Sequence, residues 1–259
     1  MLSVIILTHN EEQMLPKALE SVKNLADEIL VIDKKSTDST LEIAKKFNAK
    51  LVKFEGEEFD QWRNLGIEHA KGDWLFYLDP DERVTENLAK EIRAVIDQEE
   101  NDVYKMKRQN YWWGKQFQYC GASPDWVTRL FKKEKLQKWQ GIIHESPVYE
   151  GKVGELENSL VHFTHRDFVS GLKKSYQWTR MEAQLFYNAS HPPVKVKNLV
   201  SVFVKKFWQK YISQKGYQEG VEGFIESLVQ AINRFMVYVL LWEMQQEPSL
   251  EEKYKKLDN

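Results

Sequence analysis

The stretch SVIILTHNEEQMLPKALESVKNLADEILVID, residues 3–33, decides the fold class of this chain. It opens with an apolar run rich in β-branched residues, SVIILT (3–8), and closes with a second apolar run, EILVID (28–33). Both runs are typical of buried strands. Between them, apolar residues recur at helical spacing, with acids early and lysine late, as the helix dipole favours. The stretch therefore predicts a strand–helix–strand unit.

The same alternation continues through the first hundred residues. Further strands are expected at 49–54 and 73–79, and further helices at 36–47, 60–70 and 85–96. Strands that alternate with helices of this length form parallel sheets with helices on both faces. In such sheets, ligands bind outside the carboxyl ends of the strands. Polar residues follow three of these ends, namely Thr8 to Asn10, Asp33 to Ser36, and Asp79 to Asp81.

The pattern changes after residue 100. Segments that mix apolar and polar residues, such as 102–113, 125–133 and 159–166, are expected to be strands. Three helical segments should follow, the first from about Asp167, the others over 194–213 and about 219–246. The sequence therefore predicts an α/β fold, a mostly parallel sheet flanked by helices, with a C-terminal helical extension.

Composition narrows the class of protein. The 259 residues carry a net charge of −2, which argues against nucleic-acid binding. The single cysteine, Cys120, excludes an internal disulfide and fits a reducing compartment. The N-terminus lacks the basic start of a signal peptide, and no run of about 18 apolar residues is without charges. We therefore expect a cytoplasmic protein with no membrane-spanning helix.

Asp79 and Asp81 flank Pro80, which restricts the backbone to a tight turn. Paired oxygen ligands at such a turn suit Mg²⁺ or Mn²⁺, which bind through one or two carboxylates plus substrate phosphates. The alternative is ordinary turn chemistry at the start of the helix that follows. No G-x-G-x-x-G follows the first strand and no G-x-x-x-x-G-K-[ST] occurs, so dinucleotide and P-loop binding are disfavoured. A metal-bridged nucleotide diphosphate is the leading candidate ligand.

Four segments, taken together, resemble the inverting family 2 glycosyltransferases of the GT-A fold. They are SVIILTHNEE (3–12), EILVIDKKSTDST (28–40), RNLGIEHAKGDWLFYLDPDE (63–82) and GIIHE (141–145). The chain is most similar to the branch that resembles lipopolysaccharide-core β-1,4-glucosyltransferases. The resemblance implies a catalytic domain over 1–165, with a nucleotide-sugar half over about 1–100 and an acceptor half over about 101–165. Residues 166–259 are then a helical region that contacts a membrane surface or another subunit.

The resemblance also implies roles for single residues. Thr8, Asn10 and Glu11 are expected to line the nucleotide pocket, Asp33 to contact the base, and Arg63 and Asn64 to help hold the nucleotide sugar. Asp79 and Asp81 form the D-x-D pair that holds the nucleotide and a divalent metal. Lys34 and Lys35 depart from the small or glycine-containing turn of relatives, which affects the local geometry of the pocket.

Inverting sugar transfer needs a base that takes the proton of the acceptor hydroxyl. The resemblance implies Glu145 for this role, with His144 assisting, and Asp125 is the alternative. His162 is a candidate third ligand for metal or phosphate, as in some relatives, or a histidine satisfied within the core.

The segment from Ala183 to Gln218 contains no Asp or Glu but six lysines, interleaved with aromatic and aliphatic residues. Such a helix binds anionic membrane surfaces, or it packs on the main domain with a solvated basic face. In the last helix, Glu226 and Arg234 interrupt a broad apolar stripe, so this helix is expected to be core or a dimer contact.

The implied function is metal-dependent transfer of a sugar from a nucleotide-diphospho-sugar, most simply a UDP-sugar. The acceptor would be a cell-envelope glycan of the lipopolysaccharide-core kind or a lipid-linked saccharide. The enzyme would be cytoplasmic or peripheral on the inner face of the cytoplasmic membrane. Three alternatives stay open: a non-catalytic membrane-surface interaction protein on the same scaffold, a nucleotidyltransferase, and a phosphatase that uses the D-x-D carboxylates. The sequence leaves the oligomeric state open.

Overall fold

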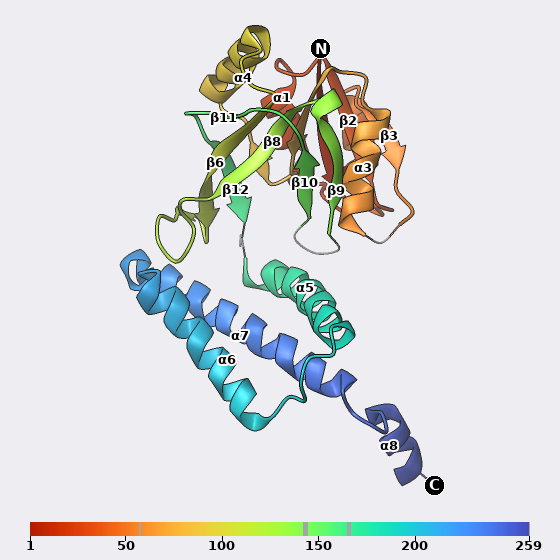
Figure 1. The fold of residues 1–259 in the computed structure, drawn as a ribbon, viewed down its shortest axis with the longest axis vertical. Coiled ribbons are helices and arrows are strands. Elements are labelled where there is room, and N and C mark those ends of the chain that lie inside the picture. Colours follow the sequence, from red (N-terminus) through yellow and green to blue (C-terminus); the bar gives the residue numbers. More distant parts are fainter. Residues whose placement is uncertain (57, 142–144, 165–166, 259) are drawn as a thin grey trace. The chain divides into compact units, whose positions relative to one another are not determined.

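The computed structural model describes residues 1–56, 58–141, 145–164 and 167–258. The chain divides into two compact units (Figure 1). The sheet unit comprises Met1–Tyr111 and Pro124–Thr164, and the helical unit comprises Trp112–Ser123 and His165–Asn259.

The first half of the sheet unit alternates strands and helices as the sequence predicts. Its elements are β1 (Leu2–Thr8), α1 (Leu15–Val22), β2 (Glu28–Asp33), α2 (Thr40–Lys46), β3 (Lys50–Lys53), α3 (Phe59–His69), β4 (Trp74–Leu78) and α4 (Glu86–Gln98). Strand β1 pairs in parallel with both β2 and β4, and β2 pairs in parallel with β3. The carboxyl ends of β1, β2 and β4 therefore meet at one edge of the sheet.

The second half makes the sheet mixed. It adds β5 (Glu82–Arg83), β6 (Val103–Trp112), β8 (Trp126–Lys132), β9 (Leu136–Gln140), β10 (Ser146–Tyr149), β11 (Val153–Glu155) and β12 (Leu160–Thr164). The strand order is β3-β2-β1-β4-β8-β6-β12-β5, with β8 antiparallel to both of its neighbours. Strands β9 and β10 form a separate antiparallel pair. The predicted α/β class, with a sheet flanked by helices and a C-terminal helical extension, is confirmed, and the sheet as a whole is mixed.

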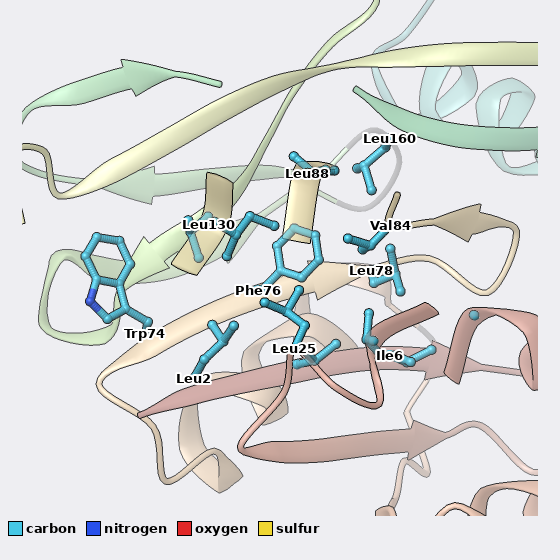
Figure 2. Close-up of a cluster of buried hydrophobic side chains, with 14 of the residues drawn as sticks. Leu2, Ile6, Leu25, Trp74, Phe76, Leu78, Val84, Leu88, Leu130 and Leu160 are labelled. Atoms are coloured by element: carbon cyan, nitrogen blue, oxygen red, sulfur yellow. The ribbon is translucent and has the colours of Figure 1, made fainter. Parts of the chain in front are cut away.

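The core of the sheet unit lies on both faces of the sheet, because side chains alternate along a strand. From β1, Leu2 and Ile6 enter one cluster of buried residues with Phe76, whereas Ile5 enters another cluster with Tyr77. Figure 2 shows part of the first cluster, in which Leu2 and Ile6 of β1 and Phe76 of β4 lie together with Leu88 of α4. The strand ends that carry polar residues are thus fixed by buried apolar neighbours.

Helix α3 packs closely on the other face. A Cβ atom on Gly66 would lie 2.9 Å from Cγ2 of Ile5 and 3.0 Å from the Tyr77 hydroxyl, so only glycine allows this approach. The Trp62 indole donates a hydrogen bond of 2.9 Å to the carbonyl oxygen of Ile32 in β2. These contacts fix the position of Arg63 and Asn64, which lie between Trp62 and Gly66 on the helix.

The helical unit contains α5 (Phe168–Asn188), α6 (Val196–Trp208), α7 (Gly220–Met244) and α8 (Leu250–Leu257). Three of these helices match predicted segments, and α8 was not predicted. Helix α7 packs against both α5 and α6. The loop 112–123 is held by two buried acids of this region. Glu219 accepts hydrogen bonds from the backbone N–H groups of Gln118 and Tyr119 at 2.7 and 2.8 Å, and Glu226 accepts one from the Trp113 indole at 3.2 Å.

One helix in the described part of the chain, Gly216–Met244 with 29 residues, is long and apolar enough to cross a membrane. Glu226 and Arg234 lie within it, so it contains no run of about 18 residues without a charge. Length and composition alone do not make a helix a membrane span, because core helices of soluble proteins have the same properties. Glu226, in the middle of this helix, has no exposed surface.

Candidate active site

The carboxyl ends of β1 and β2 are joined by a buried hydrogen-bond network around Asp33. The Thr8 hydroxyl donates to Oδ1 of Asp33 at 3.0 Å, and the backbone N–H of Ser36 donates to Oδ2 at 2.9 Å. Asp33 is only 3% exposed and Thr8 is fully buried. The network brings two of the predicted nucleotide-binding residues together and fixes the start of the loop after β2.

The loops that follow β1 and β2 are also bonded to each other. Asn10 has a backbone φ of +55°, and its N–H donates to the Ser36 hydroxyl at 2.8 Å. Its side-chain oxygen accepts from the N–H of Thr37 at 2.8 Å. The N–H of Glu11 donates to the Thr40 hydroxyl at 2.8 Å. The polar side chains at this edge therefore lie on two loops that are hydrogen-bonded to each other.

Asn64 binds strand β9 through its amide group. Its Nδ2 donates to the carbonyl oxygen of Trp139 at 3.0 Å, and its Oδ1 accepts from the N–H of Trp139 at 2.7 Å. The side chain thus pairs with β9 as a neighbouring strand would. This contact ties the β9–β10 pair to α3.

Arg63 contacts two acidic residues that are far apart in the sequence. Its Nε donates to Oε1 of Glu145 at 2.6 Å, and its Nη2 donates to Oδ1 of Asp79 at 3.2 Å. The centre of the guanidinium group lies 4.7 Å from the centroid of the Trp139 ring, so the ring holds the plane of the group. Both acidic partners are partly or largely buried, with side chains 24% and 10% exposed.

Asp79 stands in a buried network of charges. The guanidinium group of Arg129 donates to Oδ2 of Asp79 and also to Oε1 of Glu82, the latter at 3.1 Å. Glu82 is fully buried, and its Oε2 accepts from the backbone N–H of Asp79 at 2.9 Å. Burial by itself would raise the pKa of Asp79, but the charges of Arg129 and Arg63 hold it far below its usual range. Asp79 is therefore ionised.

Asp125, the alternative base, is held by Arg108 and Asn110. Arg108 donates to both of its carboxylate oxygens, from Nε at 2.8 Å and from Nη2 at 3.2 Å, and Nδ2 of Asn110 donates to Oδ2 at 2.9 Å. Burial opposes the charge of Asp125, but the hydrogen bond and charge of Arg108 lower its pKa. A carboxylate bonded in this way is a poor proton acceptor.

Asp81 and His162 are brought together by the pairing of β5 with β12. The N–H of Phe163 donates to the carbonyl oxygen of Asp81 at 2.8 Å, and His162 is the register partner of Glu82. Nε2 of His162 lies 3.6 Å from Oδ2 of Asp81. The second ring nitrogen, Nδ1, lies 2.6 Å from Oδ1 of Asn110.

The polarity of these contacts fixes the tautomer of His162. A carboxylate only accepts hydrogen bonds, so the NH₂ group of Asn110 faces Asp125 and its carbonyl oxygen faces the imidazole. Nδ1 of His162 must then carry the hydrogen. In the neutral ring, Nε2 presents its lone pair toward the carboxylate of Asp81. An imidazole nitrogen and a carboxylate oxygen that face each other in this way can both donate electrons to a divalent cation.

Four further residues of the site carry no signal of their own in the sequence, namely Glu82, Arg108, Asn110 and Arg129. Glu82 stands in the quoted DPDE segment, but nothing in the sequence indicates that it is buried. Arg108, Asn110 and Arg129 lie on β6 and β8, and only the antiparallel pairing of these strands brings them to the acids Asp79 and Asp125 of the site. The predicted His144 lies outside the described residues.

No group of three or more His, Cys, Asp or Glu side chains among the described residues is arranged as a complete metal cage. The pair Asp81 and His162 offers two donors, and divalent cations in phosphate-transferring sites take their remaining ligands from substrate phosphates and water. The oxygens of Asp79 are bonded to two arginines. The donor set therefore fits a cation that is completed by a diphosphate.

Comparison with protein families gives a match over residues 3–150 to the model described as "Glycosyl transferase family 2". The match covers the part of the chain that carries every side chain of the site up to Glu145.

Several proteins are similar over almost the whole chain. An uncharacterized glycosyltransferase of Rickettsia prowazekii is 26% identical over 255 residues, which cover 91% of this chain and 84% of the relative. The lipopolysaccharide core biosynthesis glycosyltransferase LpsC of Rhizobium meliloti is 24% identical over 258 residues, covering 93% and 92%. Among solved structures, S. aureus TarS 1–349 in complex with UDP-GlcNAc superposes with a TM-score of 0.51 at 15% identity, covering 98% of this chain and 91% of TarS. This last similarity concerns the fold.

Proposed function

The chain belongs to glycosyl transferase family 2 and is a glycosyltransferase, and we propose that it transfers a sugar, with inversion, from a nucleotide-diphospho-sugar bound together with a divalent cation. Membership of this family argues against the alternatives of a nucleotidyltransferase, a phosphatase and a non-catalytic scaffold. The observation that carries the proposal is the position of Arg63 between Asp79 of the D-x-D pair and Glu145.

The donor nucleotide would lie at the shared carboxyl edge of β1, β2 and β4. Thr8, Asn10, Glu11 and Asp33 stand at this edge, and the network around Asp33 keeps its two loops in place. UDP is the proposed nucleotide, because the TarS structure with the same fold contains UDP-GlcNAc. Asn64 supports this site indirectly, through its hydrogen bonds to β9.

Asp81 and His162 would hold the cation, either Mg²⁺ or Mn²⁺, because they face each other with donor atoms 3.6 Å apart. Bound there, the cation would neutralise charge on the diphosphate leaving group. Asp79 would contribute negative charge beside it, held in one orientation by Arg63 and Arg129. Asp125 would not contact the cation. It would orient the side chain of Asn110, which in turn orients the imidazole of His162.

Glu145 is the proposed base. In the transfer step, its carboxylate would take the proton of the acceptor hydroxyl while the acceptor oxygen bonds to the anomeric carbon of the sugar. The bond from that carbon to the diphosphate oxygen would break, and the nucleoside diphosphate would leave with the electron pair. Within the described part of the chain, Arg63 is the partner of Oε1 of Glu145, and Oε2 has no bonded partner. Asp125 has both oxygens bonded and a lowered pKa, which favours Glu145 over it.

The acceptor we propose is a saccharide of the cell envelope, of the lipopolysaccharide-core kind or lipid-linked. LpsC, which is similar over 93% of this chain, is named for lipopolysaccharide core biosynthesis. The proposed location is the cytoplasm or the inner face of the cytoplasmic membrane, where nucleotide sugars and lipid-linked saccharides are both within reach.

The proposal is tested by release of nucleoside diphosphate from a panel of nucleotide sugars, with Mn²⁺ or with EDTA. We expect slow release by the wild type with UDP-sugars and Mn²⁺, and acceleration when the acceptor saccharide is added. Glu145→Gln keeps the size of the side chain and removes its basicity, so it should bind the donor normally and lose the acceleration. Transfer by Glu145→Gln at the wild-type rate would remove Glu145 from the role of base.

A further inference from the structure

Helix α6 and the turn after it, Gln209–Ser213, carry a row of exposed apolar side chains. The members of the row are four residues apart and therefore adjacent on the helix surface. They are Val196, Val200, Val204, Trp208 and Ile212, with exposed fractions of 77%, 59%, 55%, 60% and 39%. We call this row the α6 stripe. Single exposed apolar residues are ordinary, but a continuous row of large ones points to an interaction surface.

The stripe is separate from the face by which α6 packs in its own unit. That inner face is made by residues such as Phe207, whose ring stacks on Tyr211 at 5.3 Å and meets Phe224 of α7 edge-on at 5.8 Å. Leu199 is partly buried against the cluster that contains Val237 and Leu241. Helix α6 thus has one apolar face for its own unit and a second one that its unit does not cover.

The charges of the segment indicate what covers the stripe. No Asp or Glu occurs from Ala183 to Gln218, and six lysines do. Lys210 is engaged in a hydrogen bond of 2.9 Å to the carbonyl oxygen of Cys120, and Lys206 is partly buried. The other four lysines, Lys195, Lys197, Lys205 and Lys215, are exposed. The surface around the stripe is therefore apolar and positively charged at once.

We propose that the α6 stripe docks the enzyme on an anionic lipid surface, with its apolar side chains among the acyl chains and the exposed lysines at the lipid phosphates. Helices of this composition lie in the interface plane, where burial of apolar area and attraction to anionic lipids add. The enzyme would then be peripheral, held by α6. The inference stands on the helical unit alone and does not depend on the proposed site in the sheet unit.

The test is co-sedimentation of the full chain with vesicles of phosphatidylcholine alone and with 30% phosphatidylglycerol, at low and at high salt. We expect binding to the anionic vesicles only, weakened by salt. Trp208→Ser removes apolar area at constant charge and should lower the partition coefficient about ten-fold. Lys197→Gln should lower it roughly five-fold.

A matched pair of variants separates the stripe from general effects of surface charge. Val204→Glu places an acid in the stripe, and Val153→Glu makes the same change at a 43% exposed position of β11 in the sheet unit. Val204→Glu should abolish vesicle binding, Val204→Lys should reduce it less, and Val153→Glu should leave it nearly unchanged. The circular dichroism spectrum and the thermal unfolding of each variant report that the protein is folded.

Three outcomes would overturn the proposal. The first is absence of vesicle binding by the wild type at low salt. The second is binding that Val204→Glu and Trp208→Ser leave intact, since another surface would then be responsible. The third is a wild-type dimer in solution that Val204→Glu dissociates while vesicles are not bound, which would make the stripe a contact between two copies of the chain.

Discussion

Nε of Arg63 lies 2.6 Å from Oε1 of Glu145, and this ion pair joins helix α3 to the residue that precedes β10. The pair is largely buried, with side chains 9% and 10% exposed. The same guanidinium group also reaches Asp79 of the D-x-D turn. The guanidinium group of Arg63 thus sets the separation between the proposed donor site and the proposed base.

Replacement of Arg63 is therefore expected to affect both stability and transfer. Arg63→Met would leave two partly buried carboxylates without this partner, which costs roughly 3 kcal/mol of unfolding free energy. Transfer should fall by at least about 100-fold, because both carboxylates lose their alignment. Arg63→Lys should restore part of the stability and little of the rate, since one ammonium group cannot bond in two fixed directions. Denaturant unfolding and a transfer assay measure the two effects. Equal recovery of both by lysine would contradict this account.

Asn110 offers a test of the path from Asp125 to His162. Asn110→Ala removes the acceptor that keeps hydrogen on Nδ1 of His162, so the apparent affinity for Mn²⁺ in the presence of UDP should fall between about 10-fold and 100-fold. UDP binding without metal should change little. Asn101→Ala, at an asparagine that contacts Tyr104 elsewhere in the same unit, is the control. A normal Mn²⁺ affinity in Asn110→Ala would show that the tautomer of His162 does not matter for the cation.

The pair of Asp27 and Arg93 predicts a pH dependence of stability. The hydrogen bond and charge of Arg93 lower the pKa of Asp27 from 3.8 to about 2. A carboxylate whose pKa is lower in the folded state stabilises the protein above its unfolded pKa, and this contribution is lost as the pH falls toward the folded pKa. Because both side chains are 37% exposed, solvent screening reduces the contribution to about 1 kcal/mol. Asp27→Asn should be less stable than the wild type by this amount at pH 7, with the gap closing between pH 4 and pH 2. A constant gap in denaturant titrations over that range would contradict the assignment.

In the helical unit, Glu219 holds the loop 112–123. Glu219→Ala removes the acceptor of two backbone N–H groups and the partner of Lys115, so it should destabilise this unit by about 2 to 4 kcal/mol. Glu243→Ala, at an exposed acid on α7, should be nearly neutral. Thermal unfolding of the two variants makes the comparison. Equal melting temperatures would mean that the loop is held by other contacts.

The sequence predicts the nucleotide half of the fold well, because each strand and helix there has its own periodic pattern. The apolar runs 3–8 and 28–33 became β1 and β2 nearly residue for residue. Prediction is weaker after residue 100, where pairing joins distant segments: β5 is a short strand that exists only because β12 returns to pair with it. The carboxylates of the site were visible as strand ends. Their arginine partners were not, because a charged residue in the middle of a strand looks like a solvated one until the neighbouring strands are known.

The most direct test of the central claim is calorimetric titration of UDP, and of other nucleoside diphosphates in parallel, with and without Mn²⁺. It should be made on the wild type, on Asp81→Ala and on His162→Ala. The account predicts binding of UDP by the wild type that Mn²⁺ strengthens, and loss of this strengthening in both variants while the proteins remain folded. Strengthening by Mn²⁺ that persists in Asp81→Ala and His162→Ala, or no binding of any nucleoside diphosphate under either condition, would contradict it.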